Sequence, residues 1–200
     1  MWALVEDNEI TKIINKPKGL VIGDTRHSRK IFELWSKEER EAIGIYEVVF
    51  DNSNKKDEAY YNNTNQSFDY ADGEVTASYG NATPQELDDR NAKDENGVEL
   101  DPVVVTEGLK TKHKKIIKQQ ASGLLAPTDW YVLKAIDVED YSVPSNVSTF
   151  RTNVRTRSNE METAIDNASD VDALKALYEY TEQADGSFAR PLGEFPTLEI

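Results

Sequence analysis

The 200-residue chain contains no cysteine, which excludes disulfide bonds and thiolate metal sites and is compatible with a reducing compartment. Its sequence also has no run approaching the roughly 20 apolar residues that a membrane-spanning helix requires. The first seven residues have no basic flank and turn acidic too early for a signal peptide. We therefore expect a protein that is made and used without signal-dependent secretion.

Apolar residues are scarce, at 38% of the chain, and the mean hydropathy is −0.65. This fraction is low for a compact globule, so we expect part of the chain to be extended or ordered by a partner. Acidic residues outnumber basic ones by 37 to 23, which gives a net charge of −14. Phosphate backbones and anionic lipids repel such a chain, so we expect no nucleic-acid partner and no membrane partner.

Motifs that carry chemistry are missing as well. The sequence has neither a glycine-rich phosphate loop nor the calcium loop of alternating aspartates. Asp24, His27 and Ser28 place an acid, a base and a nucleophile in one loop, but catalytic triads are assembled from separate elements around an oxyanion hole. Paired carboxylates for glycoside chemistry stay open, because such pairs are set in space. We expect no enzymatic activity, no catalytic residues, no cofactor and no metal site.

Residues 1–87 are predicted to form a small β-rich domain. The dipeptides Asp7-Asn8 and Asp72-Gly73 lie between strand-like runs and tolerate the positive φ angles of tight hairpin turns. Ser36 is followed three residues later by Glu39, and this capping-box spacing predicts a short helix.

The remaining chain is predicted to comprise three further parts. Residues 88–105 are acidic with few apolar positions, and we interpret them as an extended linker. Residues 106–180 show apolar positions at helical spacing, so they predict a helical hairpin or bundle. Within them, the lysine cluster 110–118 is interpreted as a solvated face or a surface for an acidic chain. Residues 181–200 are predicted to be an irregular tail. The β-rich part and the helical part together predict the fold class α+β.

The helical part carries two apolar patterns. Gly123 and Pro127 are predicted to end its first helix, and Thr128 to cap a short second helix. On that helix Trp130, Leu133 and Ile136 recur every three residues and define an apolar edge. A longer helix follows Pro144, and its apolar stripe consists of Val147, Phe150, Val154, Met161, Ala164 and Ile165. Two interpretations stay open for the aromatic rings, which either pack on each other between the helices or anchor a partner.

The stretch Leu124-Leu125-Ala126-Pro127-Thr128-Asp129-Trp130-Tyr131, followed by Phe150-Arg151-Thr152-Asn153-Val154-Arg155, resembles a known carboxy-terminal motif. The motif is that of tailed-phage tail assembly chaperones and tail-fibre-associated proteins. There, a leucine-rich helix end meets Thr-Asp-Trp, and a second helix carries Tyr-Arg followed by Leu-Arg or Val-Arg. Phe150 stands where tyrosine is usual, which removes a hydroxyl but keeps the ring. The opening residues 1–9 are similar to the β-rich start of many phage fibre-associated proteins.

The resemblance implies a non-enzymatic phage protein that binds tail or tail-fibre subunits, either as an assembly chaperone or as a permanent component. It would act in the virion tail or in the host cytoplasm during assembly, within a larger assembly or as a homo-oligomer. We assign partner binding to Trp130, Tyr131, Phe150, Arg151, Val154 and Arg155. Addition of a partner strand to the β-rich part is a second expected mode of binding.

Two alternatives stay open. One is a minor capsid or neck accessory protein. The other is a carbohydrate-binding fibre-tip protein, whose exposed aromatic rings would stack on sugars. The candidate rings are Trp2, Trp35, Tyr60, Tyr61, Tyr70 and Tyr79.

Overall fold

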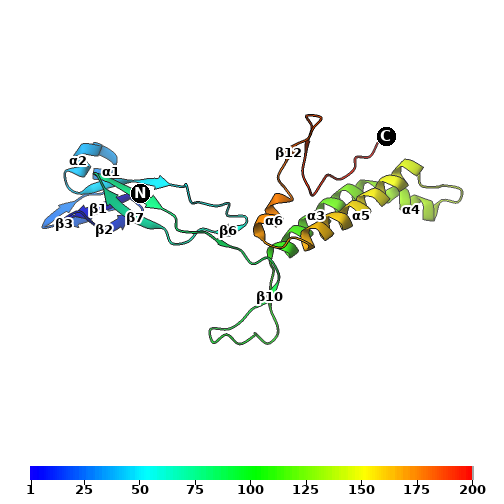
Figure 1. The fold of residues 1–200 in the computed structure, drawn as a ribbon, viewed down its shortest axis with the longest axis horizontal. Helices are drawn as coiled ribbons and strands as arrows, with labels where there is room; N and C mark the ends of the chain where they lie inside the picture. Colours follow the sequence, from blue (N-terminus) through cyan, green and yellow to red (C-terminus); the bar gives the residue numbers. More distant parts are fainter. Residues whose placement is uncertain (200) are drawn as a thin grey trace. The chain divides into compact units, whose positions relative to one another are not determined.

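The computed structural model describes residues 1–199 and divides into two compact units, residues 1–83 and the remainder of the chain from residue 84 (Figure 1). The first unit is built mainly of strands and the second mainly of helices, so the predicted α+β class is confirmed. Among the described residues, no helix combines the length and the apolar character needed to traverse a bilayer.

The first unit contains two short helices among its strands. In chain order, its elements are β1 (Trp2–Glu6), β2 (Glu9–Ile14), β3 (Leu20–Ile22), β4 (Thr25–His27), α1 (Ile31–Leu34), α2 (Lys37–Glu41), β5 (Ile45–Asp51), β6 (Tyr61–Asn62), β7 (Ser67–Ala71) and β8 (Glu74–Ser78). The unit boundary falls within β9 (Thr83–Pro84). Local signals explain several of these elements: both predicted hairpin turns have positive φ angles, and Ser36 and Glu39 form the predicted capping box.

Five strands form one sheet in the order β2-β1-β5-β8-β7. Neighbouring strands are antiparallel except for β5 and β8, which pair in parallel. The two edge strands, β2 and β7, also contact each other, so the sheet is curled. This curl places the two edges against each other, which reduces the free edge available for the expected addition of a partner strand.

Two apolar clusters lie in the first unit, and β1 contributes to both. Leu4 packs with the residues of one cluster, while its neighbours Ala3 and Val5 pack in the other. This follows from the strand geometry, because successive side chains point to opposite faces. The unit therefore has a buried core of its own.

The second unit is organised around two long helices. Its elements are β10 (Arg90–Asn91), β11 (Val105–Thr106), α3 (Leu109–Leu125), the 3-10 turn η1 (Ala126–Thr128), α4 (Asp129–Asp137), α5 (Ser145–Asp166), α6 (Val171–Ala176), β12 (Thr181–Glu182) and β13 (Phe188–Ala189). Helices α3 and α5 pack side by side, and α4 lies at one end of the pair (Figure 1).

The predicted break between the first two helices is absent. Helix α3 continues past Gly123 to Leu125, and the chain then passes through η1 directly into α4. Pro127 lies in the first turn of η1, where the missing N–H group of proline costs no helical hydrogen bond. Thr128 makes no side-chain cap. Its hydroxyl donates instead to the Leu125 carbonyl, at 2.6 Å.

The segment interpreted as an extended linker, residues 88–105, folds back on itself as a hairpin arm. β10 pairs with β11, and Lys93 bridges to Glu99 further out along the arm. The base of the arm is bound to the start of α3, where the Gly108 N–H donates to the Asp89 carboxylate at 2.8 Å. This bond lowers the pKa of Asp89. The first two backbone N–H groups of α3, those of Leu109 and Lys110, donate to the carbonyls of Glu86 and Leu87, so the preceding chain satisfies them.

The tail, residues 181–199, is only partly irregular. It begins with the β12–β13 hairpin and then runs back along the helices. Leu192 is buried, and Phe195 and Leu198 pack against the cluster around Phe150. Arg157 of α5 holds this segment by donating to two of its backbone carbonyls.

Candidate functional site

The six residues assigned to partner binding lie on two helices. Trp130 and Tyr131 are on α4, whereas Phe150, Arg151, Val154 and Arg155 are on α5. The structure brings the arginine at 151 against the start of α4 but separates the rings of Trp130 and Phe150, which belong to different environments. They do not form one surface.

Phe150 and Val154 are part of the interior. Their exposed fractions are 6% and 0%, and they form a cluster with Ala121 of α3. The tail residues Phe195 and Leu198 cover this cluster further. The apolar surface of these two side chains is already used within the folded unit, so it is not exposed to a partner there.

Trp130 has the opposite environment. It is 50% exposed and stacks on Tyr131, with 3.8 Å between the ring centroids. Leu133 and Ile136, one and two turns further along α4, are 60% and 76% exposed. We call these three side chains, Trp130, Leu133 and Ile136, the α4 edge. An apolar row on one helix face without a covering element is a feature of interaction surfaces.

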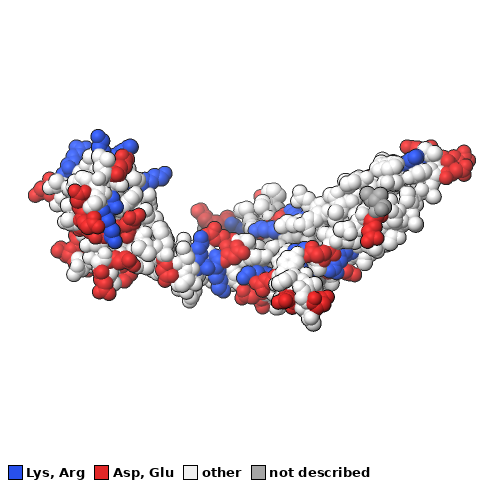
Figure 2. Space-filling view, turned by 90° about the horizontal axis from the view of Figure 1, so that it is seen from above, with Lys and Arg blue, Asp and Glu red and all other residues white. Residues whose placement is uncertain are grey.

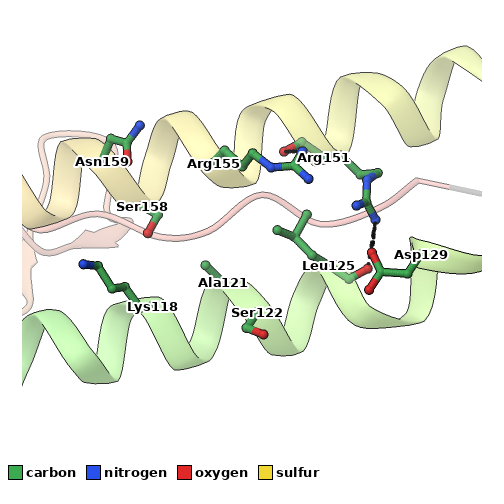
Figure 3. A pocket seen from close by; sticks show the side chains of 9 residues that line it. All are labelled: Lys118, Ala121, Ser122, Leu125, Asp129, Arg151, Arg155, Ser158 and Asn159. Carbon is green, nitrogen blue, oxygen red and sulfur yellow. Dashed lines mark hydrogen bonds and ion pairs between the residues drawn. The ribbon is translucent and has the colours of Figure 1, made fainter. Parts of the chain in front are cut away.

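Arg151 braces the start of α4 from α5. Its side chain is mostly buried and donates to the Leu125 carbonyl at 3.1 Å and to the Thr128 hydroxyl. It also forms an ion pair with Asp129, with 2.8 Å between nitrogen and oxygen (Figure 3). The Thr-Asp-Trp stretch and the arginine of the second helix are thus joined physically. These contacts give this part of the motif a structural role, which is to hold the start of α4 against α5.

Arg155 lies one turn away from Arg151 and is exposed. It lines an open groove of about 440 Å³ between α3 and α5, together with Lys118, Ser122 and Asn159 (Figure 3). Its guanidinium donates to the Arg151 carbonyl at 3.2 Å. The groove mixes charged and small polar side chains, and it has no histidine or paired carboxylates among its lining residues.

The lysine cluster of α3 is paired with carboxylates of the same chain. The pairs are Lys110 with Asp88, Lys114 with Asp166, Lys115 with Glu107, and Lys118 with Glu162. The hydrogen bond to Asp166 raises the pKa of Lys114. The cluster therefore meets acidic groups of its own chain, which leaves little net positive field for phosphate.

The residues with potential for chemistry remain dispersed. The ring of His27 contacts that of Trp35 edge-on, with centroids 5.8 Å apart. His113 is hydrogen-bonded through Nδ1 to the hydroxyl of Tyr178 at 2.8 Å. Burial lowers the pKa of His113, and Lys112 lowers it further. Within residues 1–199, His, Asp and Glu side chains do not gather in any group of three that could hold a metal ion.

The aromatic rings considered for sugar binding serve as packing residues. Trp2 and Trp35 pack against the core of the first unit, and Tyr60 and Tyr61 are buried. The hydroxyls of Tyr46 and Tyr70 are hydrogen-bonded to each other at 3.0 Å. This hydrogen bond and the burial of the ring raise the pKa of Tyr46 to about 12. Tyr79 lies beneath the Lys55 ammonium, which is 5.8 Å from the ring centroid. These rings do not offer the exposed platform that stacking on sugars requires.

The sequence assignment omitted several exposed residues. Leu133 and Ile136 belong to the same three-residue recurrence as Trp130, so their spacing was the signal that identified them. An acidic run follows them at residues 137–140. A second exposed apolar group lies on the hairpin arm, with Val98, Val103, Val104 and Val105 each about half exposed or more. The consecutive valines were its signal within an otherwise acidic segment.

Comparison with protein-family models, with curated proteins and with solved structures gave no match. The structure by itself defines an α+β protein of two units, with an exposed apolar helix edge braced by a mostly buried arginine.

Proposed function

We propose that the chain is a non-enzymatic structural or assembly protein of a tailed phage, which binds tail or tail-fibre subunits through protein–protein contacts. The observation that carries this proposal is the α4 edge, where Trp130, Leu133 and Ile136 lie exposed in one row. Burying such a row against another chain is favourable, because apolar surface removed from water contributes about 25 cal/mol per Å².

The rigidity of this edge supports the proposal. Arg151 ties α4 to α5 through contacts with Leu125, Thr128 and Asp129. A surface that is already held in its binding conformation loses little conformational entropy on association. The motif that resembles tail assembly proteins therefore acts, in this proposal, by presenting the α4 edge, while Phe150 and Val154 stabilise the helix pair beneath it.

The experiment has two parts. Mass spectrometry of purified phage particles distinguishes a permanent tail component, present at a fixed ratio to the tail proteins, from a chaperone that leaves before maturation. Co-expression with each tail and fibre subunit then identifies the partner by co-purification. We expect the double variant Leu133→Gln/Ile136→Gln to lose the partner, and Ile116→Gln, which alters an exposed apolar residue on α3, to retain it. Absence from particles together with no co-purifying tail subunit contradicts the proposal.

A further inference from the structure

The α4 edge has a polar boundary at one end. At 3.6 residues per turn, Asp137 lies on the same side of α4 as Trp130, Leu133 and Ile136. Asp129 lies on this side at the other end, where its carboxylate is neutralised by Arg151. The row therefore runs from a neutralised carboxylate through three apolar side chains to Asp137, which has no ion-pair partner among residues 1–199.

Negative charge concentrates at the carboxyl end of α4. Asp137, Glu139 and Asp140 are exposed there, and within the described residues none of them forms an ion pair. Figure 2 shows acidic side chains gathered at the end of the helical unit where α4 lies. Lys134, the one basic residue of the stretch 129–140, lies with its ammonium 4.3 Å from the ring centroid of Tyr141 and 5.9 Å from that of Trp130. The helix dipole adds further negative potential at this end.

A second copy of this chain does not fit the edge. Each whole chain carries a net charge of −14, so two copies repel each other. Parallel pairing of two α4 helices would also bring the acidic residues at 137–140 of both copies together. A stable complex buries about 800 Å² on each partner, which is more surface than three side chains provide. Contacts beyond the apolar row are therefore required, and the uncompensated carboxylates favour a cationic partner over an acidic one.

We propose that the α4 edge docks an amphipathic helix of another protein, which is apolar on one face and carries lysine or arginine where it meets residues 137–140. The three anchors of the edge recur every three residues, which is close to the i, i+3, i+4, i+7 spacing with which helices contact apolar faces. Because part of the attraction is between exposed charges, the affinity decreases as the ionic strength rises. This inference rests on the proposed function for the biological source of the helix, but its chemistry is independent of that source.

The test uses the full-length protein and two synthetic amphipathic peptides of about eighteen residues, with the same leucine stripe. One peptide carries lysines on its polar face and the other carries glutamates. Fluorescence anisotropy of the labelled peptides gives the dissociation constants. We expect the lysine peptide to bind at least about tenfold more tightly than the glutamate peptide, and Leu133→Gln/Ile136→Gln to weaken its binding by about tenfold or more. Ile116→Gln is the matched control and should leave binding unchanged, with circular dichroism confirming that every variant is folded.

A charge-reversal variant sharpens the test. Asp137→Lys/Glu139→Lys/Asp140→Lys should reverse the preference, so that the glutamate peptide binds more tightly. Equal binding of both peptides, or binding that Leu133→Gln/Ile136→Gln leaves unchanged, overturns the inference. Concentration-dependent self-association that this double variant abolishes also overturns it, in favour of a second copy. Peptide binding as expected, without any tail subunit in the co-expression experiment, contradicts the proposed function and leaves this inference standing.

Discussion

Helices α4 and α5 carry the same kind of sequence pattern and have opposite environments. Both place apolar residues at helical spacing, and both were assigned to partner binding. On α5 the stripe is covered by α3 and by the tail, so Phe150 and Val154 are buried. On α4 the row of Trp130, Leu133 and Ile136 is exposed. An amphipathic pattern therefore identifies the apolar face of a helix but not the element that covers it.

The difference has a cause in the remainder of the chain. Residues 192–198 return along α5, where Leu192 is buried and Phe195 and Leu198 pack, partly buried, against the cluster around Phe150. No described segment covers the α4 edge in the same way. Its three side chains are therefore half to three-quarters exposed. The buried stripe should accordingly contribute to folding, and the exposed row to association.

We expect the largest effect when one buried residue of α5 and one exposed residue of α4 are each truncated to alanine. Phe150→Ala should destabilise the protein by about 3–5 kcal/mol, because it leaves a cavity in the interior. Leu133→Ala should change the stability by less than about 0.5 kcal/mol, since its side chain is mostly in solvent. Urea unfolding followed by circular dichroism measures both values. Comparable losses in the two variants would break the comparison between α5 and α4.

The next effect concerns the side chain that joins the two helices. Arg151→Gln should cost about 1–3 kcal/mol, because its mostly buried contacts with Leu125, Thr128 and Asp129 are lost. Arg155→Gln is the matched control, one turn away and exposed, and should change the stability by less than about 0.5 kcal/mol. Amide hydrogen exchange should also accelerate in α4 for Arg151→Gln alone. Unchanged protection of α4 in this variant would mean that other contacts hold the edge in place.

The hairpin arm extends the comparison, because it too carries exposed apolar residues on an anchored base. At Gly108 a Cβ atom would lie 2.5 Å from the backbone of Asp88, so Gly108→Ala should destabilise the base by about 1–3 kcal/mol. Gly123 has open space around it in the interior of α3, and Gly123→Ala should stabilise the helix by about 0.5–1 kcal/mol. The melting temperature from thermal unfolding should decrease for Gly108→Ala and increase for Gly123→Ala. A neutral effect at Gly108 would show that the arm is not held at its base.

Local signals in the sequence predicted local structure well. The turns at Asp7-Asn8 and Asp72-Gly73 and the capping box at Ser36 are all confirmed, because each depends on residues within one turn of the chain. The hairpin arm and the parallel pairing of β5 with β8 were not predicted. Both depend on contacts between residues distant in sequence, for which composition and periodicity carry no direct signal.

The candidate site shows the same limit. The sequence indicated the apolar spacing of the α4 edge, and the resemblance included Arg151 and the Thr-Asp-Trp stretch in one motif, whereas their contact is a finding of the structure. It did not indicate that Phe150 is covered by a tail that begins some thirty residues later, since nothing local to Phe150 records that contact. The exposed part of the site was therefore recognisable as a pattern, while its separation from the buried part required the three-dimensional structure.

The smallest expected effect is a pH dependence on the buried side of the helical unit. Burial lowers the pKa of His113 below its ordinary value of 6.5, whereas the unfolded chain protonates near that value. As the pH falls through 6.5, the unfolded state takes up the proton first, so stability decreases until the pH lies below the folded pKa. His113→Gln removes this titration and keeps a group that can hydrogen-bond to Tyr178. We expect the melting temperature of the original protein to decrease more than that of His113→Gln between about pH 7.5 and about pH 5.5. Parallel decreases in the two proteins would instead assign the acid sensitivity to other groups.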